Sequence, residues 1–166
     1  MTQALAPPFL VASLILCAAG VFKLRSPVVA ATALRMSPWA VRGLACGEIA
    51  LGAACALVPS RPLAVGLAVV YGGFSLVAVL LMRRGVPCGC FGDNDLPVSL
   101  AHVIASELLG ALALGAALAG PRGLGWVLGR PAPTAVVLVV GIAGGLYATL
   151  VLYTQLPAAW AAWSGE

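Results

Sequence analysis

Charged residues are scarce in this 166-residue chain, where Asp, Glu, Lys and Arg together make up 8% of the sequence. Ordinary globular domains carry roughly 25% charged residues. Hydrophobic residues reach 62%, and the mean hydropathy is +1.08. A chain with so little polar surface does not fit a soluble domain, so the composition indicates an integral membrane protein.

Acidic residues are especially few, since 9 Lys and Arg stand against 5 Asp and Glu and give a net charge of +4. In membrane proteins, basic residues beside the spans usually meet lipid headgroups and set the orientation. We therefore expect the lipid bilayer to be the partner of these charges and exclude nucleic acid.

Long apolar runs dominate what is present. A window of about 20 residues identifies five candidate spans, separated by short breaks rich in proline and serine. No linker long enough to separate domains is visible, so we expect one membrane domain over residues 1–166. The predicted fold is all-α, a polytopic transmembrane helical bundle with a four-helix core and a fifth, C-terminal helix. The predicted spans are Leu5–Phe22, Trp39–Val58, Leu63–Met82, Leu100–Ala119 and Thr134–Tyr153.

Small residues four apart predict where helices meet, because they let two backbones approach closely. We interpret them as helix–helix contacts inside one chain, with homodimerisation as the alternative. The sets are Gly43, Gly47, Ala50 and Ala54 in the second span and Gly141 and Gly145 in the fifth.

Glu48 lies inside the second predicted span. A carboxylate in the membrane costs several kcal/mol, so we expect it to face the bundle interior and to pair with a cation or hold a proton. The candidate cations are Lys23, Arg25 and Arg42, although Arg42 could instead extend to the membrane interface. Glu48 is therefore a candidate site residue, and the alternative is a structural carboxylate that locks two helices together.

His102 and Ser106 lie four residues apart in the fourth predicted span and share one helix face, from which Glu107 is turned away. His102 could act as the base that deprotonates a thiol or carries a proton. The alternative is a polar residue bonded to nearby backbone. Ser99 or Asp95 is expected to cap this helix.

Cys88 and Cys90 flank Gly89 in a short polar break between two spans. Such a pair can close only if the chain turns sharply, which glycine permits. The spacing favours redox chemistry, with an inert disulfide as the alternative. A closed site built from these cysteines, Asp93 and His102 has too few strong ligands for zinc or copper, so we expect no metal.

Three further cysteines lie in the apolar spans, where packing is the expected role of a thiol. Cys17 is expected to be an inert buried thiol. Cys46 and Cys55 are nine residues apart on the second span. Either could act as a resolving thiol, but burial in the bundle is the expectation for both.

Three motifs, in this order, resemble the methylamine-utilisation MauE family within the DoxX-like membrane proteins. They are Lys23-Leu24-Arg25-Ser26-Pro27, then Arg42 with Glu48-Ile49-Ala50-Leu51-Gly52, then Cys88-Gly89-Cys90-Phe91-Gly92. The similarity covers about residues 5–119. The chain departs from the family pattern at Ala105-Ser106, where relatives tend to carry Arg-Asn, and in the additional segment 134–153.

The resemblance implies a four-helix membrane core associated with thiol–disulfide exchange, and in the founding setting with maturation of methylamine dehydrogenase. It makes Cys88 and Cys90 the redox pair, and Lys23, Arg25 and Glu48 the polar motif residues. It also implies a thioredoxin-like partner outside the cytoplasm. A non-catalytic scaffold or metal-handling module is the competing class. A quinone is a candidate electron acceptor, although no quinone motif is visible.

The orientation in the cell membrane is a conflict between two arguments. Lys23, Arg25, Arg35, Arg83 and Arg84 fall on one predicted side, and Arg61, Arg122 and Arg130 on the other. Charge counting would put the cysteine loop in the cytoplasm. Disulfide formation belongs outside it. We favour the extracytoplasmic face from the resemblance.

Overall fold

The computed structural model describes residues 3–85 and 98–155, and within these ranges the chain forms seven helices and no strand. Five of them are long and apolar enough to cross a membrane. At 1.5 Å per residue, helices of this length span the roughly 30 Å of a bilayer core. The all-α, multi-pass prediction is therefore confirmed. The five are α1 (Ala6–Arg25), α3 (Pro38–Leu57), α4 (Arg61–Arg84), α5 (Leu100–Ala119) and α7 (Ala132–Thr154).

Two short helices were not predicted, α2 (Pro27–Leu34) and α6 (Leu124–Leu128). Ser26-Pro27 reads as a break in the sequence, but a proline in the first helical turn also starts a helix. Arg35, in the left-handed conformation, ends α2. A window of about 20 residues cannot resolve elements this short, so hydropathy reports only the break around them.

The helix starts follow from serine and proline. Ser37 and Ser60 cap α3 and α4, accepting hydrogen bonds from the backbone N–H groups of Ala40 and Leu63 at 3.2 and 3.4 Å. A proline follows each serine directly or one residue later, in the first turn of the helix. These caps are local, which is why the sequence predicted the spans to within a few residues.

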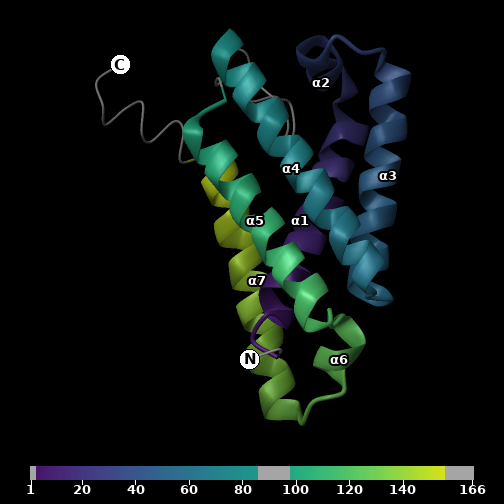
Figure 1. Ribbon diagram of the computed structural model, residues 1–166, viewed down its shortest axis with the longest axis vertical. Helices are drawn as coiled ribbons and strands as arrows, with labels where there is room; N and C mark the ends of the chain where they lie inside the picture. Colours follow the sequence, from purple (N-terminus) through teal and green to yellow (C-terminus); the bar gives the residue numbers. More distant parts are fainter. Residues whose placement is uncertain (1–2, 86–97, 156–166) are drawn as a thin grey trace.

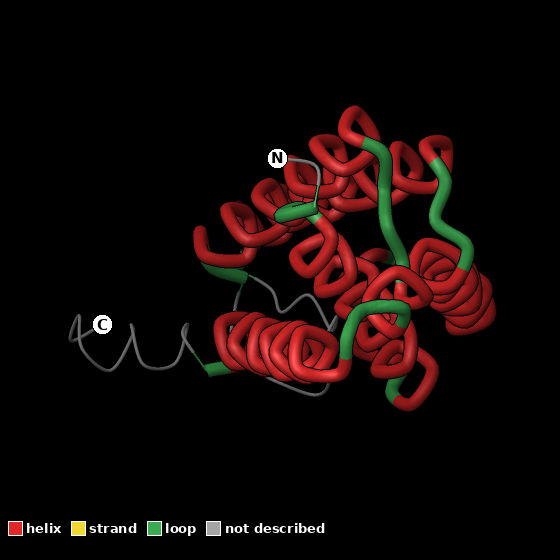
Figure 2. Tube along the Cα trace, turned by 90° about the horizontal axis from the view of Figure 1, so that it is seen from below, coloured by secondary structure: helices red, strands yellow, loops and turns green. Residues whose placement is uncertain are grey.

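The bundle has two ends (Figure 1). One end, here called the α2 end, holds α2, the last turn of α4, the first turn of α5 and the last turn of α7. The other, the α6 end, holds the start of α1, the α3–α4 connection and α6. Figure 2, turned by 90°, shows helices joined by short loops. Helix α1 packs chiefly against α3, and α4 packs chiefly against α5.

Helices α1 and α3 meet along buried residues spaced alternately four and three apart. This spacing keeps one face of each helix toward its neighbour, as in a coiled coil. Glycine lies where the backbones are closest: a Cβ at Gly20 would stand 2.7 Å from the Ala45 carbonyl oxygen, and one at Gly52 would stand 2.5 Å from that of Ser13. The two stripes are Phe9, Ser13, Leu16, Gly20 and Lys23 in α1 and Val41, Ala45, Glu48, Gly52 and Cys55 in α3.

The predicted small-residue contact in the second span is wrong as a contact inside the chain. Gly43 and Gly47 are exposed, and a Cβ at either would have no neighbour within 4 Å. In α7, Gly145 does face Val11 of α1, whereas Gly141 is open. The alternative for the exposed α3 face, contact with a second copy of the chain, stays a prediction.

Helix α7 lies at the edge of the bundle, against α1 and α5 (Figure 1). Along its length only Ile142 and Tyr153 are buried. Helix α1, by contrast, is buried at its centre, and the Tyr71 hydroxyl donates a 2.6 Å hydrogen bond to the Ala12 carbonyl oxygen. The fifth helix is thus an addition to a core formed by α1, α3, α4 and α5.

Candidate functional site

An ion pair between Lys23 and Glu48 lies in the contact between α1 and α3. Lys23 Nζ donates to both carboxylate oxygens at 2.8 Å, and each side chain is 2% exposed. Away from water, each charge is compensated only by the other, so the pair must stay together. The expectation that Glu48 faces the bundle and pairs with a cation is confirmed, with Lys23 as the partner.

Phe74 of α4 connects this pair to a cavity. Lys23 Nζ lies 4.7 Å from the centre of the Phe74 ring, a cation–π distance. The ring also forms part of the wall of a cavity of about 40 Å³, which has room for one or a few water molecules. Phe74 therefore separates a charged contact from a largely apolar space between α1, α4, α5 and α7.

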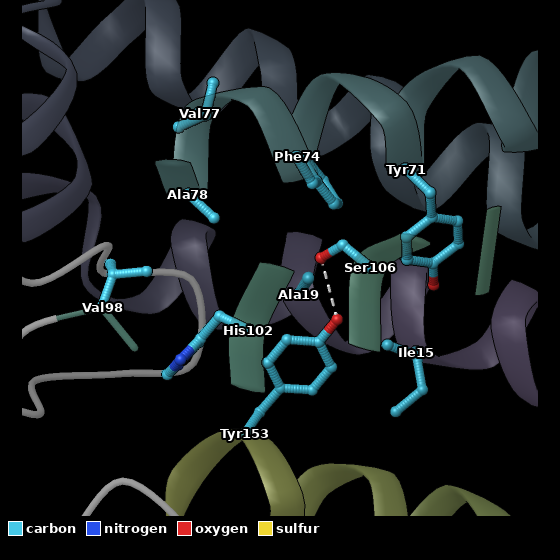
Figure 3. A pocket seen from close by; sticks show the side chains of 10 residues that line it. All are labelled: Ile15, Ala19, Tyr71, Phe74, Val77, Ala78, Val98, His102, Ser106 and Tyr153. Atoms are coloured by element: carbon cyan, nitrogen blue, oxygen red, sulfur yellow. Dashed lines mark hydrogen bonds between the residues drawn. The ribbon is translucent and has the colours of Figure 1, made fainter. Parts of the chain in front are cut away.

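The cavity is lined from four helices and ends near the point where the chain enters α5 (Figure 3). Its polar groups come from α5 and α7: the Ser106 hydroxyl and the Tyr153 hydroxyl are 3.0 Å apart. The remaining walls are aromatic or aliphatic. The lining residues are Ile15, Ala19, Tyr71, Phe74, Val77, Ala78, Val98, His102, Ser106 and Tyr153.

His102 is held in the first turn of α5. Its Nδ1 accepts a hydrogen bond from the backbone N–H of Ser99 at 3.3 Å and lies 3.1 Å from the Ser99 hydroxyl. His102 thus occupies the third helical position, where a side chain can bond back to the capping residue. Ser99, rather than Asp95, stands at the N-cap. Both expectations for His102 remain compatible with this geometry.

Other polar residues named from the sequence lie away from the cavity. Arg25 is exposed at the end of α1. Arg42 is exposed near the start of α3, and its guanidinium carbon stands 4.9 Å from the centre of the Trp39 ring. Neither arginine forms an ion pair with Glu48. The exposure of Arg42 agrees with the alternative that its side chain extends to the membrane interface. Glu107 is exposed on α5, turned away from His102 as expected.

Cys88 and Cys90 lie outside the described residues, in the connection between α4 and α5. The Cys17 thiol donates to the Ile49 carbonyl oxygen at 3.6 Å, and Cys55 is buried. Cys46 is exposed, so the expectation that it is packed inside the bundle is wrong. It lies two positions before Glu48, which turns it away from the α1 contact.

Within residues 3–85 and 98–155, no three His, Cys, Asp or Glu side chains lie close enough to share a metal ion. The structure adds three aromatic residues that sequence reasoning missed: Tyr71, Phe74 and Tyr153. Tyr153 stands at the end of the fifth predicted span, where a tyrosine usually anchors at the interface, so the sequence carries no signal that it points inward. Only packing shows that Tyr153 points inward.

These features define a multi-pass α-helical membrane protein with a buried ion pair and an adjoining cavity. The family described as methylamine utilisation protein MauE matches residues 2–121, which is most of the chain. The chain belongs to this family. The matched range contains α1 to α5 and excludes α7. Neither the curated proteins nor the solved structures give a match.

Proposed function

We propose that the protein is a membrane thiol–disulfide redox protein that exchanges electrons with a thioredoxin-like partner through Cys88 and Cys90. The observation that carries the proposal is the Cys88-Gly89-Cys90 sequence in the connection between α4 and α5 of a MauE-family bundle. The connection is short, so it offers a reactive sulfur and little recognition area. A partner with its own binding surface supplies the rest.

In the proposed exchange, one disulfide is reduced for each disulfide that forms. A thiolate of the reduced protein attacks a disulfide sulfur of the partner, which forms a mixed disulfide and releases the partner's other thiolate. The second cysteine of the pair then attacks the mixed disulfide. The products are an oxidised Cys88–Cys90 pair and a reduced partner, with two electrons and two protons transferred, and the reverse direction follows the same steps.

In this proposal His102 is the group that holds a proton for the exchange. In the neutral ring, Nδ1 accepts from the Ser99 N–H; in the cationic ring, an Nδ1–H can donate to the Ser99 hydroxyl 3.1 Å away. Ser99 therefore serves both protonation states without rotation of the ring. An imidazolium close to a thiol favours the thiolate.

In this proposal Lys23 and Glu48 position the cavity wall through Phe74, because the pair is fully engaged with itself and with that ring. Arg25 and Arg42 remain accessible to headgroups or to a partner's surface. A quinone stays a proposed electron acceptor; its ring would need the cavity of about 40 Å³ to widen. The competing function is a non-catalytic scaffold or metal-handling module.

The test is trapping of a mixed disulfide. Cys88→Ser or Cys90→Ser leaves one thiol without its resolving partner, so at least one of the two variants should accumulate a covalent complex with the thioredoxin-like protein in native membranes. The complex should disappear on reduction and run at the summed mass in a gel.

Cys46→Ser is the matched control, because Cys46 is an exposed thiol outside the pair. It should trap nothing and should leave the oxidation of Cys88 and Cys90 unchanged. If neither Cys88→Ser nor Cys90→Ser traps a partner under oxidising conditions, the scaffold or metal-handling function replaces the redox proposal.

A further inference from the structure

We infer that Arg122 and Arg130, which lie against one indole ring at the α6 end, form a binding site for the phosphate of an anionic phospholipid headgroup. The inference goes beyond the proposed thiol exchange and does not depend on it. The family match ends at residue 121, so both arginines belong to the part of the chain that the MauE family does not cover.

The first observation is that these arginines lie at a bilayer surface. The connection between α5 and α7 runs from residue 120 to residue 131 and contains the short helix α6. Because α5 and α7 are both long and apolar enough to cross a membrane, so short a connection stays at the level of the lipid headgroups. Figure 1 shows α6 between the end of α5 and the start of α7.

The second observation is that two guanidinium groups share one aromatic ring. The guanidinium carbon of Arg130 lies 4.1 Å from the centre of the Trp126 ring, and that of Arg122 lies 5.5 Å from it. Both side chains are half-buried, so solvent screens the repulsion between these neighbouring cations incompletely. The indole attracts each cation but carries no negative charge to neutralise it. A bound anion would do so.

The third observation is that no carboxylate of the described residues lies at the α6 end. Across residues 3–85 and 98–155, the acidic residues are Glu48 and Glu107. Glu48 is paired with Lys23. Glu107 lies in α5, whose last residue is Ala119, so it is about 18 Å along the helix axis from this end. We therefore expect the compensating anion from outside these residues, and the lipid headgroup is the source that a bilayer surface supplies.

The fourth observation is a hydrogen-bond donor without a partner. Arg122 Nε is buried, and no described residue accepts a hydrogen bond from it. A buried donor without an acceptor is costly, and each such group in a native structure calls for an explanation such as a bound ion. A guanidinium presents its N–H groups as a planar fork that fits two oxygens of one phosphate. A small turn of the half-buried side chain would bring this fork to the headgroup.

The segment that carries these side chains is fixed to the bundle. A Cβ at Gly123 would stand 2.8 Å from Pro59 Cδ and would also meet the Ala56 carbonyl oxygen, so the position requires glycine. Val127 is fully buried in the core, and Trp126 packs against the same core. The indole between the two arginines is thus held in place before any lipid binds, which lowers the cost of ordering the site.

The two guanidinium groups also predict which phospholipid the site prefers. Phosphatidylglycerol has an anionic phosphate and an uncharged head. Phosphatidylcholine carries a quaternary ammonium beside its phosphate, and two nearby cations disfavour that group.

The experiment titrates the full-length, detergent-solubilised protein with phosphatidylglycerol and, separately, with phosphatidylcholine, and measures bound lipid by native mass spectrometry. Phosphatidylglycerol should bind more tightly. Arg122→Gln or Arg130→Gln should raise its apparent Kd about ten-fold, the scale of a lost hydrogen bond to a charged group. Arg61→Gln is the matched control, because Arg61 is an exposed arginine at the same end. It removes the same charge and should leave the Kd nearly unchanged.

Thermal unfolding separates a lipid site from a structural role. Without anionic lipid, Arg122→Gln relieves repulsion and should not lower the unfolding temperature. With phosphatidylglycerol, this variant should lack the increase in unfolding temperature that the bound lipid gives the unaltered protein. An equal loss of stability with and without the lipid would make Arg122 a structural residue and overturn the inference.

Three further outcomes would also overturn it. Equal affinity of the unaltered protein for the two lipids would remove the preference for an anionic headgroup. Equal weakening by Arg61→Gln would mean that lipid follows the net charge of the α6 end rather than this pair of arginines. Inorganic phosphate that competes at the same concentration as phosphatidylglycerol would make the ligand a soluble anion. The thiol exchange stands in each case, because the trapping experiment tests it separately.

Discussion

At the residue scale, helix periodicity decides which cation can meet Glu48. Lys23 and Arg25 are two residues apart on α1, about 200° around the helix, so only one of them can face α3. Arg42 lies six residues before Glu48, about 240° around α3, and points away. The sequence named three candidate partners, and this angular argument sets Arg42 aside; the choice of Lys23 over Arg25, and the burial of the pair, required the structure.

Breaking the Lys23–Glu48 pair should be more harmful than replacing it. Lys23→Met or Glu48→Leu alone leaves one charged group buried without its partner, and each should destabilise the protein by about 3–5 kcal/mol. The double change of Lys23 to Met and Glu48 to Leu should cost less than the two single changes combined. Thermal unfolding in detergent, followed by circular dichroism, measures the three variants.

Arg42→Met is the control for loss of a cation, because Arg42 is exposed and stacked on Trp39. It should leave the unfolding temperature nearly unchanged. If the loss of stability in the double variant equals the sum of the losses in the two single variants, the pairing of Lys23 with Glu48 is contradicted.

At the element scale, the α1–α3 contact shows why a motif can mislead. The sequence contains two kinds of small-residue spacing on α3: Gly43 with Gly47, four apart, and Ala45 with Gly52, seven apart. The first matches the common transmembrane motif but faces outward; the second follows the alternating four-and-three stripe that packs on α1. The stripe includes Glu48, so the position of the buried carboxylate, rather than glycine spacing, identifies the packed face.

Added side-chain volume should therefore be tolerated on the exposed face of α3 and not on the face that packs against α1. Gly52→Ala would place a methyl group 2.5 Å from the Ser13 carbonyl oxygen and 2.6 Å from the Cys17 sulfur, which forces the helices apart. We expect a loss of about 1–3 kcal/mol. Unfolding measurements on Gly52→Ala and Gly47→Ala compare the two faces directly.

Gly47→Ala meets nothing within 4 Å and should match the unaltered protein as a monomer. A large loss of stability at Gly47 together with a smaller assembled species would instead identify the exposed face as a contact between copies. Equal tolerance at Gly52 would contradict the close packing of α1 on α3.

At the scale of the whole molecule, the structure changes the charge argument for orientation. Lys23 is buried and neutralised by Glu48, so it does not act as a free loop charge. The α2 end keeps the exposed Arg25, Arg35, Arg83 and Arg84, and the α6 end has Arg61, Arg122 and Arg130. Such a small difference is a weak determinant, because the positive-inside rule depends on a clear excess near the spans. Hydropathy predicted the spans. Orientation depends on a few basic residues, and the sequence alone could not distinguish the buried, paired Lys23 from the loop charges.

The proposed redox function requires the α2 end to face away from the cytoplasm, where disulfides persist. Cys88 and Cys90 follow α4, which ends at that end, so a membrane-impermeant maleimide should label them in intact, mildly reduced cells. Gly125→Cys is the matched control, because Gly125 is exposed in α6 at the opposite end. It should react only after the membrane is opened.

If Gly125→Cys reacts in intact cells and Cys88 and Cys90 do not, the pair faces a reducing compartment. Cytoplasmic thiols would then reduce the Cys88–Cys90 pair. The same labelling comparison therefore also decides whether the pair receives its electrons from the cytoplasmic side.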